Sequence, residues 1–305
     1  MKKQFIVLFS LLTLAITASA QKEYKISKTS GQLNLHVAGA IVEGYSGNEI
    51  IFSLPAGETE KVDERAKGLR VISGSGFVDN SGLGLDISEK GTEVNVNVVN
   101  KKIDGVLTIK VPQNIKVTFA NQSSIYQEDI ILKNLKNELE ISTSYNKIKL
   151  ENNTGPMNIK SLYGSIDASF VEPIKGPVSI VSVYGHVDVS LPVSVKANVD
   201  LSTSYGKLYA ADGLKIALEK NVAEEKPKDE DLITTIKSAT NEALLISGLK
   251  SGSGTIISNN KNIRVANGIA VYGGRSSEDI KGKINGGGAN FILKSNYDNV
   301  YLRVK

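Results

Sequence analysis

Two aspartates, Asp167 and Asp188, lie 21 residues apart, and His186 precedes the second by two positions. If the fold brought the two carboxylates together, they could share a proton, bind a cation or act as a glycosidase pair. A second candidate set consists of tyrosines, Tyr145, Tyr163, Tyr184 and Tyr205. Tyrosine is enriched in binding surfaces, so a row of these side chains could hold a sugar ring or a partner chain. Both sets require elements that place equivalent residues side by side.

A sequence repeat between residues 137 and 212 supplies such elements. Four segments align in register: LEISTSYNKIKL (139–150), MNIKSLYGSIDA (157–168), VSIVSVYGHVDV (178–189) and VDLSTSYGKLYA (199–210). Their tyrosines fall 18, 21 and 21 residues apart. A fixed period of about twenty residues is typical of a solenoid, because one unit cannot bury its apolar side alone and must stack on its neighbours.

Within each unit, apolar and polar residues alternate with the two-residue period of a β-strand. The two strands are separated by Tyr-Gly, or Tyr-Asn in the first unit, where glycine or asparagine would tolerate the positive φ of a tight corner. We therefore predict an all-β fold, a parallel β-helix or β-solenoid with coils of about 18–22 residues, stacked roughly 4.8 Å apart. The alternative is an antiparallel sandwich built from similar hairpins.

The register of the repeat places both candidate sets on the surface of this solenoid. Asp167 and Asp188 become stacked neighbours about 5 Å apart, with His186 on the same face. The four tyrosines form a column at the corners. Each set also has a structural interpretation: the acidic column can be a solvated polar face that Lys149 neutralises, and the tyrosines can stack on one another and stiffen the corners.

The N-terminus carries the features of a secretory signal peptide over residues 1–20. Lys2 and Lys3 are followed by an apolar stretch and by the cleavage signal Ala18-Ser19-Ala20. That stretch is too short for a spanning helix, so we expect cleavage after Ala20 and export to the periplasm or the cell surface. Position 21 is not cysteine, and no bacterial lipid anchor is therefore expected.

The rest of the chain is predicted to form a single domain over residues 21–305. Irregular N-terminal coils occupy 21–116, regular coils 117–218, a charged insertion 219–243, and C-terminal coils 244–305. The insertion includes EEKPKDED (224–231) and lacks strand alternation. Near the end, Phe291/Leu293, Tyr297 and Val300/Leu302 repeat the internal offsets of the first regular unit, so the chain ends in phase with its own middle.

Composition excludes several classes of chemistry. The chain has no cysteine, which rules out disulfides, thiolate metal sites and cysteine nucleophiles. No zinc or calcium motif, nucleophile elbow or phosphate-binding glycine motif occurs, so we expect no metal and no cofactor. Without Lys2 and Lys3 the chain has 34 basic and 32 acidic residues, a balance that argues against a nucleic-acid partner.

Several segments together resemble the putative-adhesin family of exported bacterial β-strand-repeat proteins, which is related to the head-GIN putative autotransporter adhesins. They are VEGYSGNEI (42–50), the block from GLRVIS to DNSGLGLDISEKG (68–91), the S-x-Y-G coils and the closing GGGANFILKSNYDNVYLRVK. The resemblance implies a parallel β-helical fold in a surface or periplasmic setting. Its motifs are structural, and no functional residue carries over from them.

The sequence therefore favours a non-enzymatic, exported cell-envelope or surface β-solenoid that binds a glycan or a protein partner. No transmembrane segment is expected in the mature chain, and its oligomeric state is left open. The alternative is a polysaccharide-active β-helix hydrolase or lyase that uses Asp167 and Asp188, with His186 as a further catalytic candidate. A groove beside these three residues would favour the enzyme, and a flat or convex face would favour the binding protein.

Overall fold

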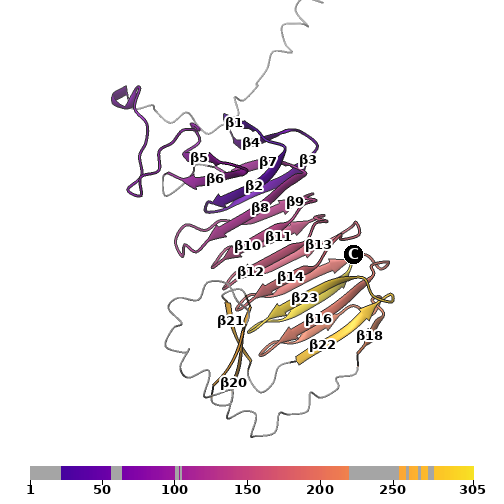
Figure 1. The fold of residues 1–305 in the computed structure, drawn as a ribbon. Helices are drawn as coiled ribbons and strands as arrows, with labels where there is room; N and C mark the ends of the chain where they lie inside the picture. Colours follow the sequence, from indigo (N-terminus) through magenta and orange to yellow (C-terminus); the bar gives the residue numbers. More distant parts are fainter. Residues whose placement is uncertain are drawn as a thin grey trace, which may run out of the picture.

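The computed structural model describes residues 22–55, 64–99, 103, 105–219, 254–258, 261–266, 269–273 and 278–305 (Figure 1). The signal peptide predicted over 1–20 and all but the first residue of the insertion predicted over 219–243 lie outside these ranges. The described residues form β-strands joined by turns and loops, and the short 3-10 helix η1 (Glu64–Ala66) is the one helix among them. None of them belongs to a helix long and apolar enough to cross a membrane.

Two long sheets, called sheet A and sheet B, contain most of the described strands. In spatial order, sheet A consists of β1 (Lys22–Ser27), β4 (Glu49–Leu54), β7 (Thr108–Pro112), β3 (Ala40–Tyr45), β9 (Ile130–Lys133), β11 (Ile148–Glu151), β13 (Ile166–Ser169), β15 (Val187–Leu191), β24 (Val300–Val304) and β17 (Leu208–Ala210). Sheet B consists of β18 (Ile216–Leu218), β22 (Glu278–Ile284), β16 (Ala197–Thr203), β23 (Ala289–Ser295), β14 (Val178–Ser182), β12 (Met157–Ser161), β10 (Leu139–Thr143), β8 (Asn114–Asn121), β2 (Ser30–His36), β6 (Glu93–Val98) and β5 (Leu85–Lys90).

In the regular part, the chain passes alternately from one sheet to the other, and the strands stack in parallel (Figure 1). Coil 1 comprises β10 and β11, coil 2 comprises β12 and β13, and coil 3 comprises β14 and β15. Leu139 pairs with Met157, which pairs with Val178, so the predicted offsets of 18 and 21 residues are the true register of these three coils. The inward columns predicted from alternation are confirmed by the burial pattern of the same strands.

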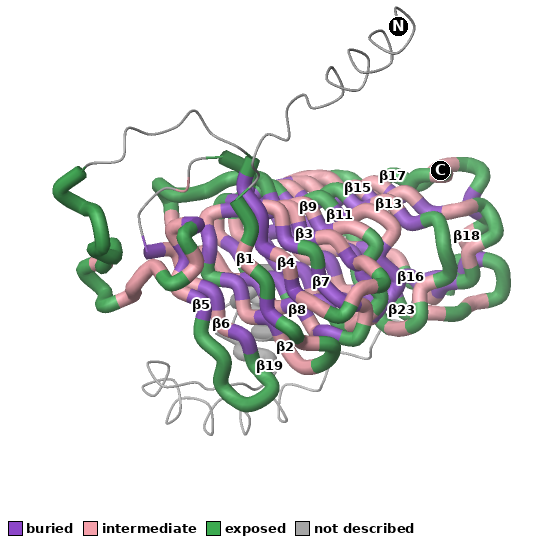
Figure 2. Tube along the Cα trace, turned by 90° about the horizontal axis from the view of Figure 1, so that it is seen from above, coloured by how far each residue is buried: buried purple, intermediate pink, exposed green. Residues whose placement is uncertain are grey.

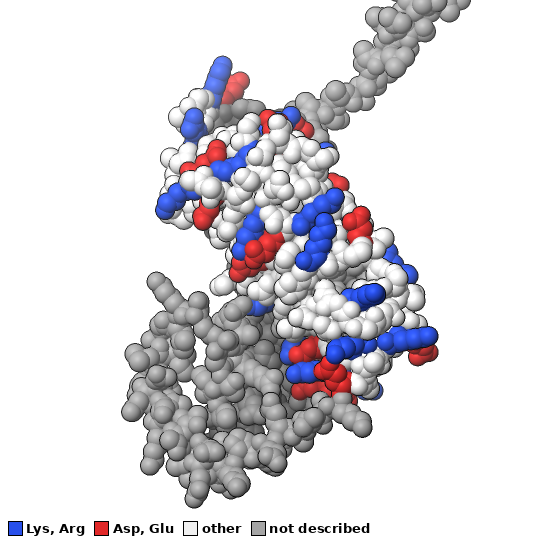
Figure 3. Space-filling view, turned by 45° about the vertical axis from the view of Figure 1, so that its right-hand side comes forward, with Lys and Arg blue, Asp and Glu red and all other residues white. Residues whose placement is uncertain are grey.

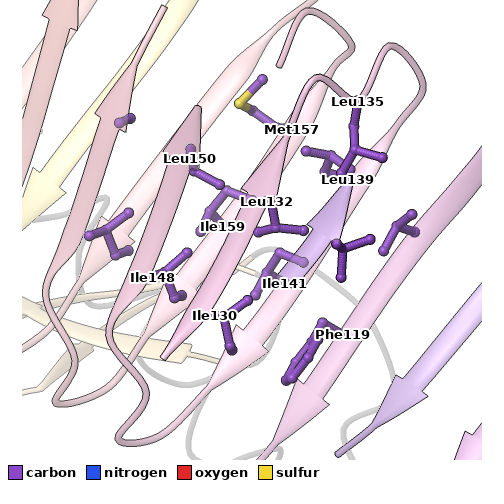
Figure 4. Packing of buried hydrophobic residues seen from close by; sticks show 14 of the residues in the cluster. Phe119, Ile130, Leu132, Leu135, Leu139, Ile141, Ile148, Leu150, Met157 and Ile159 are labelled. Atoms are coloured by element: carbon purple, nitrogen blue, oxygen red, sulfur yellow. The ribbon is translucent and has the colours of Figure 1, made fainter. Parts of the chain in front are cut away.

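The core is a continuous apolar layer between the two sheets. Figure 4 shows Ile148 and Leu150 of sheet A near Ile141 and Ile159 of sheet B, and all four side chains are at most 1% exposed. Buried and partly exposed residues alternate along the strands (Figure 2). Because every coil places apolar residues at the same inward positions, neighbouring coils share one core instead of forming separate ones.

The stacking order of the coils differs from their order in the sequence. The fourth repeat, here coil 4, comprises β16 and β17, and we predicted that it would follow coil 3. Instead, the C-terminal coil (289–304), which comprises β23 and β24, is inserted between them: Ile180 pairs with Leu293, which pairs with Leu201. The expectation of an uninterrupted column from coil 3 to coil 4 is therefore wrong.

Antiparallel strands occur at both ends of the two sheets. At the N-terminal end β1 pairs with β4 and β5 with β6, and at the C-terminal end β22 pairs with both β16 and β18. Part of the predicted C-terminal coils forms a separate antiparallel sheet, of β19 (Gly254–Ser258), β20 (Lys261–Ala266) and β21 (Ile269–Gly273). The fold is therefore all-β with long mixed sheets, which is consistent with a β-solenoid.

Candidate functional site

A buried hydroxyl organises three of the tyrosine corners, those of Tyr184, Tyr205 and Tyr297. Ser182, the last residue of β14, donates a hydrogen bond to the carbonyl oxygen of Gly164 on the preceding coil (2.9 Å) and accepts one from the amide of Gly185 (2.9 Å). This pair of hydrogen bonds recurs at Ser295, with Gly185 and Asp298, and at Thr203, with Asp298 and Gly206. At these three corners the serine or threonine two positions before the tyrosine thus ties the corner to the neighbouring coil, whereas Ser161 only accepts a hydrogen bond from the amide of Gly164 and the Thr143 hydroxyl has no described partner.

The glycine after the tyrosine is needed for a reason other than the one predicted. Gly164, Gly185 and Gly206 do not have positive φ angles. A Cβ at Gly164 would instead lie 1.7 Å from the carbonyl oxygen of Asn146, and one at Gly185 would lie 2.5 Å from that of Gly164. The prediction of a left-handed corner is therefore wrong, and glycine is required because the backbone of the neighbouring coil approaches too closely for a side chain.

These corners hold a continuous ladder of five tyrosine rings. Ring centroids are 4.6 Å apart between Tyr145 and Tyr163, and 4.8 Å apart between Tyr163 and Tyr184. Tyr184 then stacks on Tyr297 of the C-terminal coil at 4.7 Å, and Tyr297 stacks on Tyr205 at 4.9 Å. The predicted tyrosine column therefore exists, but the predicted contact between Tyr184 and Tyr205 does not, because Tyr297 lies between them.

The stacking decides which part of each ring a ligand can reach. The interplanar angles lie between 4° and 12°, so the rings are nearly parallel and each inner ring has both faces covered by its neighbours. The five residues are nevertheless 38% to 59% exposed. The ladder therefore presents ring edges and hydroxyl groups, and a sugar ring cannot lie flat along it as the sequence led us to expect. None of the five hydroxyls has a hydrogen-bond partner among the described residues.

The acidic pair lies on the outer face of sheet A, as predicted. Asp167 and Asp188 are paired positions on β13 and β15. Each carboxylate has its own basic partner: the Nε2 atom of His186 lies 3.0 Å from Asp167, and the Nε atom of Arg303 donates to both oxygens of Asp188 at 2.8 Å. With a separate partner for each, the pair resembles a neutralised surface column more than two carboxylates that share a proton.

A second aromatic contact adjoins the acidic pair. Tyr301 of β24 stacks on Tyr209 of β17 with centroids 5.1 Å apart. The Arg303 guanidinium carbon lies 5.1 Å from the centre of the Tyr301 ring, and the His186 ring meets that ring edge-on at 6.2 Å. Sequence reasoning missed Tyr301 and Arg303 as members of this surface. The matching offsets of Tyr297 and Tyr301 to Tyr205 and Tyr209 were the available signal, but offsets alone do not give the stacking order.

Lys149, the predicted neutralising residue, interacts mainly with a different carboxylate. Its ammonium lies 2.7 Å from Glu151 on the same strand, and this hydrogen bond is the largest cause that lowers the pKa of Glu151 and raises the pKa of Lys149. Asp167 contributes only a weaker electrostatic effect to Lys149. Over the face visible in Figure 3, positive and negative side chains are interspersed rather than gathered into a field of one sign.

Two hollows formed by described residues lie at the N-terminal coils. One is lined by residues that include Ala38, Ile103, Leu107 and Tyr126, and the other by residues that include His36, Ile72, Val99 and Asn121. Neither is lined by Asp167, Asp188 or His186. These hollows therefore supply no groove for the acidic pair.

Comparison with known proteins gives one family match. Residues 128–256 match the model of the Toastrack DUF4097 family, a segment that includes all four coils of the sequence repeat. The match supports the predicted likeness at the level of a Toastrack domain, and the link to the head-GIN adhesins stays a prediction. No curated protein matches the sequence.

One solved structure aligns over nearly the whole chain, but with low sequence identity and a low TM-score. It is described as a putative cell adhesion protein from Clostridium sporogenes ATCC 15579, and the alignment covers 93% of this chain and all of that one. The identity is 12% and the TM-score is 0.36. At that score the likeness bears on neither the fold nor the function of this protein.

Proposed function

We propose that this protein is a non-enzymatic, exported β-solenoid of the cell envelope or cell surface, and that it binds a glycan or a protein partner along the tyrosine ladder. The observation that carries the proposal is the row of five stacked rings, half-exposed, whose hydroxyls lack partners among the described residues. Stacking fixes each ring in place, so little side-chain entropy is lost when a partner binds. The finer classification as a parallel β-helix is part of this proposal.

The spacing of the ladder restricts the partner. Successive rings are 4.6 to 4.9 Å apart, so the five hydroxyls form a row with a nearly constant repeat. Each hydroxyl can donate one hydrogen bond and accept others. An extended glycan chain, or the strand repeat of another β-sheet protein at about 4.8 Å, could match several hydroxyls at once. A partner without such a repeat would meet only one or two of them.

Two observations make a polysaccharide hydrolase or lyase the weaker candidate function. His186 and Arg303 each engage one carboxylate of the acidic pair, which leaves no separate acid and base aimed at a common point. The side chain of Asp167 is also 59% exposed, whereas carboxylic acids used in catalysis owe a raised pKa to burial or to a like charge nearby.

Export rests on the predicted signal peptide, which lies outside the described residues. The absence of cysteine is compatible with an oxidising compartment, because the continuous core between the sheets needs no disulfides. Cleavage after Ala20 is tested by N-terminal sequencing of the protein recovered from cell-envelope fractions. A mature chain that begins at Met1 would contradict export by this route.

The binding proposal is tested with a glycan array of bacterial envelope polysaccharides and with three double variants. Tyr163→Phe with Tyr184→Phe removes two hydroxyls but keeps the stack, and should weaken binding by about 0.5–1.5 kcal/mol per lost hydrogen bond. Tyr163→Ala with Tyr184→Ala removes the rings and should cost about 1–3 kcal/mol per ring. Asp167→Asn with Asp188→Asn should leave binding unchanged.

The pattern across the three variants separates the two functions. Thermal unfolding of each variant shows whether it is folded before binding is measured. If the asparagine pair lost binding or abolished turnover of a polysaccharide while the phenylalanine pair behaved as the parent protein, the ladder would be structural and the enzymatic interpretation would replace this one.

A further inference from the structure

The two long sheets end at different levels at the C-terminal end. In sheet B, β16 is followed by β22 and then β18 (Figure 1). In sheet A the strand of the same coil, β17, is the last described strand. Sheet B therefore extends two strands beyond sheet A. In the regular coils every strand of one sheet faces a strand of the other, and the two added strands of sheet B have no such counterpart among the described residues.

The outer edge of β17 has backbone groups that pair with no described residue. The amide of Val300 donates to the carbonyl of Lys207 (3.0 Å), and the amide of Ala211 donates to the carbonyl of Leu302 (2.8 Å). This pattern places residues 207, 209 and 211 toward β24, so the amide and carbonyl groups of Leu208 and Ala210 point to the opposite side. No described strand pairs with them there, and such an edge is a template for an added strand.

The inner face of the overhanging strands becomes more exposed with distance from β16. Leu201 of β16 is 2% exposed, its partner Ile280 on β22 is partly buried, and Leu218 on β18 is 65% exposed. Leu218 is paired with Gly282, which is paired with the buried Val199, so these side chains share the inward face. The exposed leucine therefore lies where core residues lie in complete coils.

Two aromatic stacks also end at this edge. Tyr205 stacks on Tyr297, and Tyr209 stacks on Tyr301. Neither Tyr205 nor Tyr209 has a described ring on its other side, and they are 59% and 46% exposed. The unpaired backbone edge, the uncovered apolar face and the two open rings all lie on the same side of coil 4.

We propose that this edge of sheet A binds an extended strand of another polypeptide, parallel to β17, in the position that the next coil would occupy. The pattern of the strand follows from β24, which docks on the inner edge of β17: Val300 and Leu302 point inward, and Tyr297 and Tyr301 stack on the rings of coil 4. The partner should thus carry aromatic–x–x–apolar–aromatic–apolar. Its backbone would pair with Leu208 and Ala210, and its apolar side chains would cover Leu218 and Ile280.

This site is separate from the exposed edges of the tyrosine ladder and does not depend on the function proposed above. Its probe is a fluorescent peptide with the sequence of residues 295–305, SNYDNVYLRVK, titrated against the full-length protein by fluorescence anisotropy. We expect saturable binding. A peptide with alanine in place of both tyrosines should bind at least about tenfold more weakly, because it loses both stacking contacts.

Ala210→Pro is the decisive variant. Proline removes the amide that faces the added strand, and it is tolerated on a sheet edge because the pairing of β17 with β24 uses the neighbouring residues. Leu218→Asp is the second variant, since this side chain is already exposed and the change should leave the fold intact. Each should weaken peptide binding by about tenfold or more, while the melting temperature stays near that of the parent protein.

Two results would overturn the proposal. One is the absence of saturable binding. The other is equal binding to the parent protein and to both variants, which would mean that the peptide enters elsewhere, for example by displacing the protein's own C-terminal coil between β15 and β17.

Discussion

The tyrosine ladder and the acidic column are both products of the same repeat, yet they differ in how far their groups satisfy one another. In the ladder, one residue type recurs in five coils, and identical rings stack while their hydroxyls bond to no described residue. In the acidic column, residue types vary, and aspartates meet a histidine and an arginine. A uniform column keeps hydrogen-bonding capacity for a partner, whereas a mixed column neutralises itself.

The two surfaces also differ in how strongly they are tied to the core. The corner that holds the tyrosines depends on buried hydroxyls and on close backbone contact between coils. The acidic column rests on exposed strand positions, where ion pairs contribute little to stability. Substitutions at the corner should therefore affect folding far more than substitutions on the outer face of sheet A.

The largest effect is expected for Gly164→Ala. The new Cβ would overlap the backbone of Asn146 in coil 1, which cannot move without disturbing that coil. The free energy of unfolding should therefore fall by about 3 kcal/mol or more. Gly74→Ala is the control, because a Cβ there meets no heavy atom within 4 Å. Urea denaturation of both variants measures the difference. Equal stabilities would show that the corners are not closely packed.

A smaller effect is expected for Ser182→Ala. The change leaves the carbonyl of Gly164 and the amide of Gly185 without their buried partner and should cost about 1–3 kcal/mol. Ser182→Thr should be tolerated, because Thr203 makes the equivalent hydrogen bonds.

Arg303→Ala, on the acidic column, should cost less than about 1 kcal/mol of folding stability, since its side chain is 55% exposed. A larger loss of stability for Arg303→Ala than for Ser182→Ala would show that the acidic column, and not the tyrosine corner, is more strongly tied to the core.

The smallest effect concerns the pH dependence of the outer face of sheet A. The folded-state pKa of Glu151 is lowered, first by the hydrogen bond from Lys149, so its stabilising contribution is present above the ordinary pKa of a glutamate and is lost as the pH falls through the folded value. Lys149→Met should raise the pKa of Glu151 and flatten this acid-side dependence. An NMR titration of the Glu151 carboxyl measures the change.

Lys147→Met is the matched control for that titration, because Lys147 precedes the same strand and forms no ion pair with a described residue. It should leave the Glu151 titration where it is in the parent protein. If both lysine variants shifted the titration equally, the general positive charge of the face, and not the contact at 2.7 Å, would control Glu151.

The sequence by itself determined which residues of each coil form strands and which of them point inward. Alternation at a period of two identified the inward residues, such as Ile141, Ile159 and Ile180, and the offsets of 18 and 21 residues gave the register of coils 1 to 3. It also showed that the last residues form a coil of the same design. These features follow from local geometry, because strand alternation and corner spacing depend on neighbouring residues only.

Tertiary structure alone decided which coil lies on which. Coils with the same inward columns are interchangeable as neighbours, so periodicity could not reveal that Tyr297 lies between Tyr184 and Tyr205. The same limit hid the contact of Asp188 with Arg303, which are 115 residues apart in the sequence. It also hid the reason for the corner glycines, because the atom that excludes a side chain at Gly164 belongs to another coil.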